Sequence, residues 1–201
     1  MASSNPVFVV GIDPGTVKGG IAVVDISRNF ICWETVNCKG KPTYLSMARE
    51  YAEAMNKVLS LKPNELGLVA IEGTIHRRLN KAGRKYSNFV NYLAGYLSGI
   101  LDVENYELGD DPETMVYYVN PQTWRMTLTE SHIANPDQIA NAAIERELVS
   151  EQMLPTRKSD NHLVDALCVA DFGVSIYKRI VANKPPAIPD FEPEPYIFKD
   201  E

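Results

Sequence analysis

Residues 7–25, VFVVGIDPGTVKGGIAVVD, contain the pattern that decides the fold of this chain. The apolar run of residues 7–13 predicts a buried strand that ends on a carboxylate, Asp13. A Pro-Gly pair then favours a turn. Residues 21–27 and 30–36 are again rich in β-forming side chains, with a short polar turn between them. Three strands with such short connections predict an antiparallel meander at the start of a sheet.

After this meander the spacing of the apolar residues changes. From residue 43 to residue 61 they recur at helical spacing, and residues 66–73 form another short apolar run that ends near an acid, Glu72. Further along we expect a helix over residues 86–103, a strand over 115–121, a short helix or turn over 121–128, and helices over 135–151 and 160–181. This order predicts an α/β fold with a mixed five-stranded sheet flanked by helices.

The length of 201 residues suits one domain with a sizeable core. We expect that domain to span residues 1–182, and the Pro-rich, acidic tail of residues 183–201 to be extended or disordered. The sequence shows neither a membrane span nor the basic start of a signal peptide. We therefore expect a cytoplasmic protein of a bacterial nucleoid or a phage-infected cell, or an organellar one if a leader was removed. The three cysteines lack metal-binding spacing and are expected to be reduced thiols.

The net charge of −6 argues against a general nucleic-acid binder, but the charge is unevenly distributed. Residues 76–85 contain several cations and no acid, whereas acids collect in residues 101–113 and in the tail. The basic segment is either a solvated charged loop or a surface that contacts phosphates. Its cations are Arg77, Arg78, Lys81, Arg84 and Lys85.

Four side chains in this sequence are of types that bind metal ions, and the predicted elements would bring them together. The strand-end acids are expected to meet, because the carboxyl ends of neighbouring strands in α/β sheets share one edge. His162 and Asp165 are three residues apart in a predicted helix and so share one face. Acids this close repel each other, and Mg²⁺ prefers a few carboxylates plus water. The pattern predicts a metal site made of Asp13, Glu72, His162 and Asp165.

Each of these residues also has a simpler interpretation. Asp13 could stabilise the turn that follows it, and Glu72 could be a solvated strand end. His162 could be an ordinary residue of a first helical turn. Asp165 is harder to explain in this way, because it lies in an apolar stretch where an unpaired acid is costly. One metal site accounts for all four residues, which is why we prefer it.

Three motifs together resemble the RuvC-type Holliday-junction resolvases of the RNase H-like (retroviral-integrase-like) nuclease superfamily. They are GIDPGTVKGGIAVVD, the AIEG of residues 70–73 and the HLVDAL of residues 162–167, and the likeness covers about residues 7–175. The resemblance implies an RNase H-like fold and a homodimer that binds a four-way DNA junction and nicks two strands symmetrically. It also implies that the catalytic, metal-binding residues are Asp13, Glu72, His162 and Asp165.

The activity that this resemblance implies is that of a crossover junction endodeoxyribonuclease with two Mg²⁺ ions per site. Two cations about 3.5–4 Å apart position water and neutralise the scissile phosphate. Many relatives have an aspartate where this chain has His162. An imidazole suits Mn²⁺ as well as Mg²⁺, and it could also act as a general base. Asp13, on the central strand, is the natural bridging ligand, and the basic segment that follows Glu72 would contact DNA.

Other functions remain open at this stage. A nuclease of the same fold could act on flaps, replication forks or RNA. The DPGT of residues 13–16 is similar to the first phosphate loop of actin-like ATPases and sugar kinases. Those proteins need two such domains, however, and this chain contains no second acid-plus-glycine loop. A catalytically inactive binder of branched DNA is the last alternative, and the intact set of acids argues against it.

Two further pairs of residues have alternative roles. Tyr86 and Trp124 could stack on DNA bases, although we expect aromatic residues at these positions to belong to the core. Gly95 and Gly99 have the spacing of one helix face, which allows close packing. We favour packing within the chain over a contact between two copies.

Overall fold

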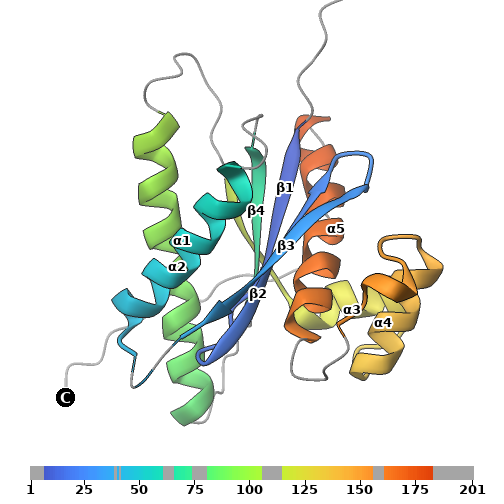
Figure 1. Ribbon diagram of the computed structural model, residues 1–201, viewed down its shortest axis with the longest axis horizontal. Helices are drawn as coiled ribbons and strands as arrows, with labels where there is room; N and C mark the ends of the chain where they lie inside the picture. Colours follow the sequence, from blue (N-terminus) through green and yellow to red (C-terminus); the bar gives the residue numbers. More distant parts are fainter. Residues whose placement is uncertain are drawn as a thin grey trace, which may run out of the picture.

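The computed structural model describes residues 7–38, 40, 42–60, 66–73, 81–105, 115–155 and 161–182 (Figure 1). The expected tail, residues 183–201, lies outside this part of the chain. The strands are β1 (Phe8–Asp13), β2 (Lys18–Asp25), β3 (Phe30–Asn37), β4 (Leu66–Glu72) and β5 (Met115–Val119). The helices are α1 (Tyr44–Ser60), α2 (Lys81–Asn105), α3 (Pro121–Thr129), α4 (Pro136–Glu145), the short 3₁₀ helix η1 (Glu151–Met153) and α5 (Asn161–Val181).

The strands form one mixed sheet in the order β3-β2-β1-β4-β5. β1 pairs antiparallel with β2, and β2 pairs antiparallel with β3, so the predicted meander is confirmed. The pairs β1–β4 and β4–β5 are parallel. β1 is therefore the central strand and is paired on both sides, which makes its end a rigid place for a functional group. No helix in the described ranges has both the length and the apolar character needed to cross a membrane.

Two layers of helices cover the two faces of the sheet. Figure 1 shows α1 and α2 on one side and α5, with α3 and α4, on the other. Alternate residues of a strand face opposite sides, so β1 contributes to both cores. Ile12 packs with α1 and α2, whereas Val9 packs with α5. By the same alternation Asp13, which follows Ile12, points to the α5 side.

Helix α5 lies very close to β1 and β2 because two strand residues have no side chain. A Cβ atom on Gly11 would lie 2.2 Å from the carbonyl oxygen of Ala166. A Cβ atom on Gly20 would lie 2.3 Å from the carbonyl oxygen of His162. These two glycines therefore set the height of the first turns of α5 above the sheet.

An ion pair joins the β2–β3 turn to the same helix. Arg28, whose φ of 71° is unusual for a residue with a side chain, places its guanidinium against the buried carboxylate of Asp171. Arg28 Nη2 also donates a hydrogen bond of 2.6 Å to Ser175 Oγ. Because Arg28 and Asp171 are 143 positions apart, the pair ties the start of the sheet to the last described helix.

Several predicted boundaries differ from the observed ones. β2 begins at Lys18 rather than at residue 21, because the glycines between them continue the ladder although glycine is rare in strands. β5 ends at Val119 rather than at residue 121. The Asn120 side chain accepts a hydrogen bond from a backbone N–H of α3, and Pro121 takes the first helical position. The short helix or turn predicted here is thus a capped helix.

The predicted start of α2 and the predicted end of α4 were also wrong. α2 begins at Lys81, five residues before the predicted start at Tyr86, because Lys, Ala and Arg are good helix formers but carry no apolar period. α4 ends at Glu145 rather than at residue 151, and the chain reverses at Glu147, which has a φ of 57°. The last helix, in contrast, begins within one residue of its predicted start.

The glycines of α2 do not pack as expected. Gly95 and Gly99 are both exposed, and a Cβ on either would meet no atom within 4 Å among the described residues. The prediction of close packing within the chain is therefore wrong. A contact with a second copy stays a prediction.

Candidate active site

Asp13 and Glu72 end the two central parallel strands. They follow Ile12 and Ile71, which are paired in the β1–β4 register, so the acids are neighbours on adjacent strands. Adjacent strands lie about 4.8 Å apart. Both residues are buried, with 9% and 7% of their surface exposed. The structure thus places two acids side by side at the carboxyl edge of the sheet, facing α5.

Helix α5 adds His162 and Asp165 from its first two turns. His162 Nδ1 is hydrogen-bonded to Asp13 Oδ2. Asp165 follows one turn later and is close enough to Asp13 and Glu72 for their charges to act on each other. All four predicted site residues therefore belong to one electrostatic cluster, although they come from three different elements.

Burial and mutual repulsion raise the pKa of two of these acids. Loss of hydration raises the pKa of Glu72 to about 8, with further contributions from the charges of Asp13 and Asp165. Burial raises the pKa of Asp165 to about 7, followed by the effect of Asp13. The hydrogen bond with Asp13 raises the pKa of His162, against the opposite effect of burial. The cluster therefore retains protons near neutral pH when no other cation balances its charge.

Arg125 of α3 is a fifth charged member of this cluster, and it was not among the predicted site residues. Its Nη2 lies 3.6 Å from Glu72 Oε1, and its guanidinium lies over the Trp124 ring, 5.1 Å from the ring centroid. Its positive charge lowers the pKa of both Glu72 and Asp165. The available signal was an arginine in the helix that follows β5, but its relevance depends on β5 lying beside β4.

Buried polar atoms around Glu72 lack ordinary hydrogen bonds. Among the described residues no partner is found for Glu72 Oε2, Trp124 Nε1 and Arg125 Nε. The Trp124 indole still lies near enough to Glu72 to lower the pKa of that carboxyl. Buried polar groups are nearly always paired, so these atoms indicate a partner beyond the described residues, such as water, an ion or a substrate.

The cluster is not a ready-made metal cage. Within the described ranges, no three His, Cys, Asp or Glu side chains converge as metal ligands do. Cations of the protein take part of the acid surface instead, since His162 contacts Asp13 and Arg125 faces Glu72. Two observations nevertheless fit a divalent cation, namely the unpaired Glu72 Oε2 and the repulsion among the acids. Carboxylate oxygens of this kind are the donors that Mg²⁺ prefers.

The predicted DNA-binding cations are described only in part. Arg77 and Arg78 lie outside the described residues, and the same holds for the side chain of Lys81, which begins α2. Arg84 and Lys85 are exposed. Half of the basic segment is therefore the first turns of a helix rather than a loop.

The two aromatic residues considered for base stacking differ from each other. Trp124 is 1% exposed and belongs to the core, as expected. Tyr86 of α2 is half-buried and packs against the edge of the core on the α1–α2 side. Burial, followed by the charges of Glu72 and Asp13, raises its pKa, so Tyr86 lies beside the acid cluster.

Solved structures with a similar fold include those of two other proteins. RuvC of Thermus thermophilus matches with a TM-score of 0.57 and 20% identity over 87% of this chain and 96% of that chain. The same values apply to the T. thermophilus RuvC in complex with Holliday junction substrate. The yeast mitochondrial Holliday junction resolvase Ydc2 matches with a TM-score of 0.51 and 13% identity over 87% of this chain and 80% of that one. No family model and no curated protein matches the sequence. At these identities the likeness confirms the predicted RNase H-like fold.

Proposed function

We propose that this protein is a structure-selective endodeoxyribonuclease that cuts four-way DNA junctions by metal-dependent hydrolysis of phosphodiester bonds. The observation that carries the proposal is the charge cluster at the ends of the central strands, formed by Asp13, Glu72, His162 and Asp165. The fold supports it, because similar solved structures include RuvC in complex with Holliday junction substrate.

Divalent cations, which we expect to be two Mg²⁺ ions with Mn²⁺ as a substitute, would neutralise the scissile phosphate and activate the attacking water. Asp13, Glu72 and Asp165 would be the oxygen donors that hold them. His162 would then leave Asp13. Its Nδ1 becomes available either as a ligand or as the base that accepts a proton from water.

Arg125 would balance charge in two states of the site. Without bound cations its guanidinium faces Glu72. When cations take over the carboxylates, the same guanidinium can turn to the phosphate, which arginine binds with two parallel hydrogen bonds. Its position over the Trp124 ring limits how far it can move. We therefore infer that Arg125 contacts the substrate rather than only neutralising Glu72.

Paired nicks require two active sites on one junction, so we expect a homodimer with two-fold symmetry. Exposed Arg84 and Lys85 directly precede Tyr86 in α2 and would contact phosphates on the way to the cut, together with Arg77, Arg78 and Lys81. Such contacts make binding strongly salt-dependent. This local basic surface is compatible with the net charge of −6 of the whole chain.

The decisive test compares cleavage of a four-way junction, a flap, a fork, a plain duplex and RNA in Mg²⁺, with the nick positions mapped. Symmetric paired nicks restricted to the junction would support the proposal. Equal cleavage of flaps, forks or RNA would assign a broader nuclease. A large stabilisation by ATP, with no junction binding, would favour the phosphate-loop alternative instead.

Two substitutions test the site within the same assay. Asp13→Asn and Asp165→Asn should abolish junction cleavage in Mg²⁺, because each removes an oxygen donor and its charge. Junction binding in Ca²⁺ should persist, since neither change touches a cation that contacts DNA. Near-normal cleavage by Asp165→Asn would show that α5 does not take part in the chemistry.

A further inference from the structure

A groove beside the acid cluster has no role in the function proposed so far. It lies between the turn that follows β1, the start of α1 and the first turns of α2, and its volume is about 490 Å³. Ligand sites in proteins typically measure roughly 300–1,000 Å³. The side chains that line it include Thr16, Val17, Tyr44, Met47, Lys85 and Tyr86.

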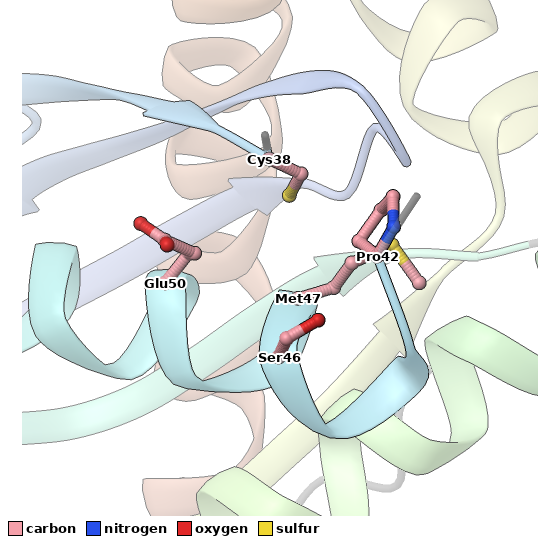
Figure 2. Close-up of a pocket in the computed structure, with 5 residues that line it drawn as sticks. All are labelled: Cys38, Pro42, Ser46, Met47 and Glu50. Carbon is pink, nitrogen blue, oxygen red and sulfur yellow. The ribbon is translucent and has the colours of Figure 1, made fainter. Parts of the chain in front are cut away.

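A second hollow adjoins this groove and differs from it in size. Figure 2 shows its lining, in which Cys38 lies opposite Met47 and Glu50 of α1. Its volume of about 30 Å³ has room for roughly a water molecule and for no organic ligand. Of these two spaces, the groove is the one that can receive a nucleotide.

The groove is placed next to the proposed site of cleavage. Thr16 follows Asp13 by three residues, so their Cα atoms lie within about 11 Å of each other. Tyr51 holds this turn, because its hydroxyl donates to the carbonyl oxygen of Gly15 at 3.0 Å. On the opposite wall, Tyr86 lies beside Asp13 and Glu72. The groove and the acid cluster therefore lie at the same end of β1.

The chemistry of the lining suits a base and its phosphate. Val17 is 73% exposed, an apolar side chain with little protein to cover it. The Tyr44 hydroxyl donates a 3.2 Å hydrogen bond to the carbonyl oxygen of Lys85, which holds α1 against α2 beneath the groove. Lys85 is exposed, and none of the described residues that line the groove is an acid. Aromatic and apolar surface next to one cation is the arrangement with which proteins bind single-stranded nucleic acid.

We propose that this groove is a subsite for one unpaired nucleotide next to the scissile phosphate. The base lies against Tyr86, Tyr44 and Val17, and Lys85 contacts a phosphate of the same strand. A base can lie face to face with these side chains only after it has left the stack of its duplex. Leaving is least costly where pairing is already interrupted, as at a branch point. This inference rests on the proposed nuclease function and adds a reason for its preference for branched DNA.

The experiment measures binding of the full-length protein to four-way junctions in Ca²⁺, where cleavage is suppressed. An abasic residue replaces, one at a time, each of the three nucleotides on either side of the mapped nick. Loss of the seated base should weaken binding about 5- to 100-fold at one position and leave the others nearly unchanged, since stacking on aromatic side chains supplies that much.

Four variants test whether the groove is where loss of the base weakens binding. Val17→Glu should abolish the difference between intact and abasic junctions, whereas Ile133→Glu should keep it, because Ile133 is 89% exposed and lies between α3 and α4. Lys85→Ala should weaken binding of both junctions equally, and Lys178→Ala near the far end of α5 should change neither. All four side chains are exposed, so the variants are expected to fold.

Two results would overturn the inference. Equal affinity for intact and abasic junctions at every position would show that no base is seated, and a difference that survives Val17→Glu would place the base elsewhere. If the wild type bound junction and duplex equally, the proposed function would fail instead. The same abasic comparison on a single-stranded oligonucleotide would then still decide whether the groove holds a base.

Discussion

Replacing Gly20 with alanine tests whether the height of α5 above the sheet controls the proposed chemistry. The new Cβ would lie 2.3 Å from the carbonyl oxygen of His162, whereas carbon and oxygen normally approach to about 3.3 Å. Both atoms are attached directly to backbone, so no side-chain rotation can relieve the contact. The start of α5 must therefore move away from β2 by about 1 Å, and it carries His162 and Asp165 with it.

The expected loss of activity follows from this displacement. A misplacement of about 1 Å in a catalytic group can lower a rate by about 100-fold. Overpacking of this kind lowers the free energy of unfolding by about 1–3 kcal/mol, which most domains survive. Gly20→Ala should therefore cut four-way junctions about 100-fold more slowly in single-turnover assays in Mg²⁺. Junction binding in Ca²⁺ should change by less than about threefold, because the exposed cations stay in place.

The same chemical change elsewhere provides the control for stability. Gly99 is an exposed residue of α2 at which a Cβ would meet no atom within 4 Å in the described structure. Gly99→Ala should therefore raise the free energy of unfolding by about 0.5–1 kcal/mol, as alanine favours a helix over glycine. A Gly20→Ala protein with wild-type cleavage and wild-type stability would refute the reasoning, because it would mean that α5 does not rest on β2 at this distance.

Four other perturbations are expected to have separable effects. In a chelator, the free energy of unfolding should fall as pH rises from about 5 to about 8, because Glu72 and Asp165 bind protons more tightly in the folded state, with pKa values of about 8 and about 7, than in the unfolded state. Glu72→Gln should make the free energy of unfolding, measured by urea titration, depend less steeply on pH. Mg²⁺ should stabilise the wild type more at pH 8 than at pH 6, because a bound metal would need ionised acids. Arg125→Ala should lower the cleavage rate about 10- to 100-fold, and Arg125→Lys should restore only part of it, since lysine lacks the planar fork. Arg28→Ala should lower the free energy of unfolding by about 1–3 kcal/mol, because it leaves the buried Asp171 carboxylate without this partner, and it should not lower cleavage per folded molecule. Arg84→Ala should weaken junction binding and reduce its dependence on salt by about one phosphate contact.

Two of these perturbations have a matched control that should not respond. Glu145→Gln, an exposed change on α4, should leave the pH slope intact, and Arg179→Ala near the end of α5 should leave the salt dependence intact. A pH slope that is equal in Glu72→Gln and the wild type would mean that this acid is ionised at neutral pH. If Arg125→Ala kept full activity, Arg125 would serve only to balance the charge of Glu72 when no metal is bound.

The parts of the fold that the sequence predicted well are those with a local signal. β1 and α5 were each predicted within one residue, because a continuous apolar run and a long helical period are both readable along the chain. The start of β2 was missed because its two glycines resemble a turn, and only the paired neighbouring strands keep them extended. The early start of α2 was missed because its first turn has no apolar residue larger than alanine and so no helical period of apolar residues.

In the candidate site, too, local sequence pattern revealed some residues and missed another. Asp13 and Glu72 were identifiable because each ends an apolar run, and His162 with Asp165 because the helical period puts them on one face. Arg125 gave no such signal, since its position beside Glu72 depends on the order of strands in the sheet. Contacts between distant elements are set by tertiary packing, so local pattern alone does not reveal them.

The position of α5 has a consequence for how the protein is made. This helix covers β1 and β2, yet it follows them by well over a hundred residues, and His162 meets Asp13 across 149 positions of the chain. Contacts that close such long loops form late in folding and slowly. A ribosome-bound or partly folded chain therefore has the strand-end acids without the helix that completes the cluster. On the proposed function, cutting activity begins only when folding ends, so an immature molecule is harmless to the DNA around it.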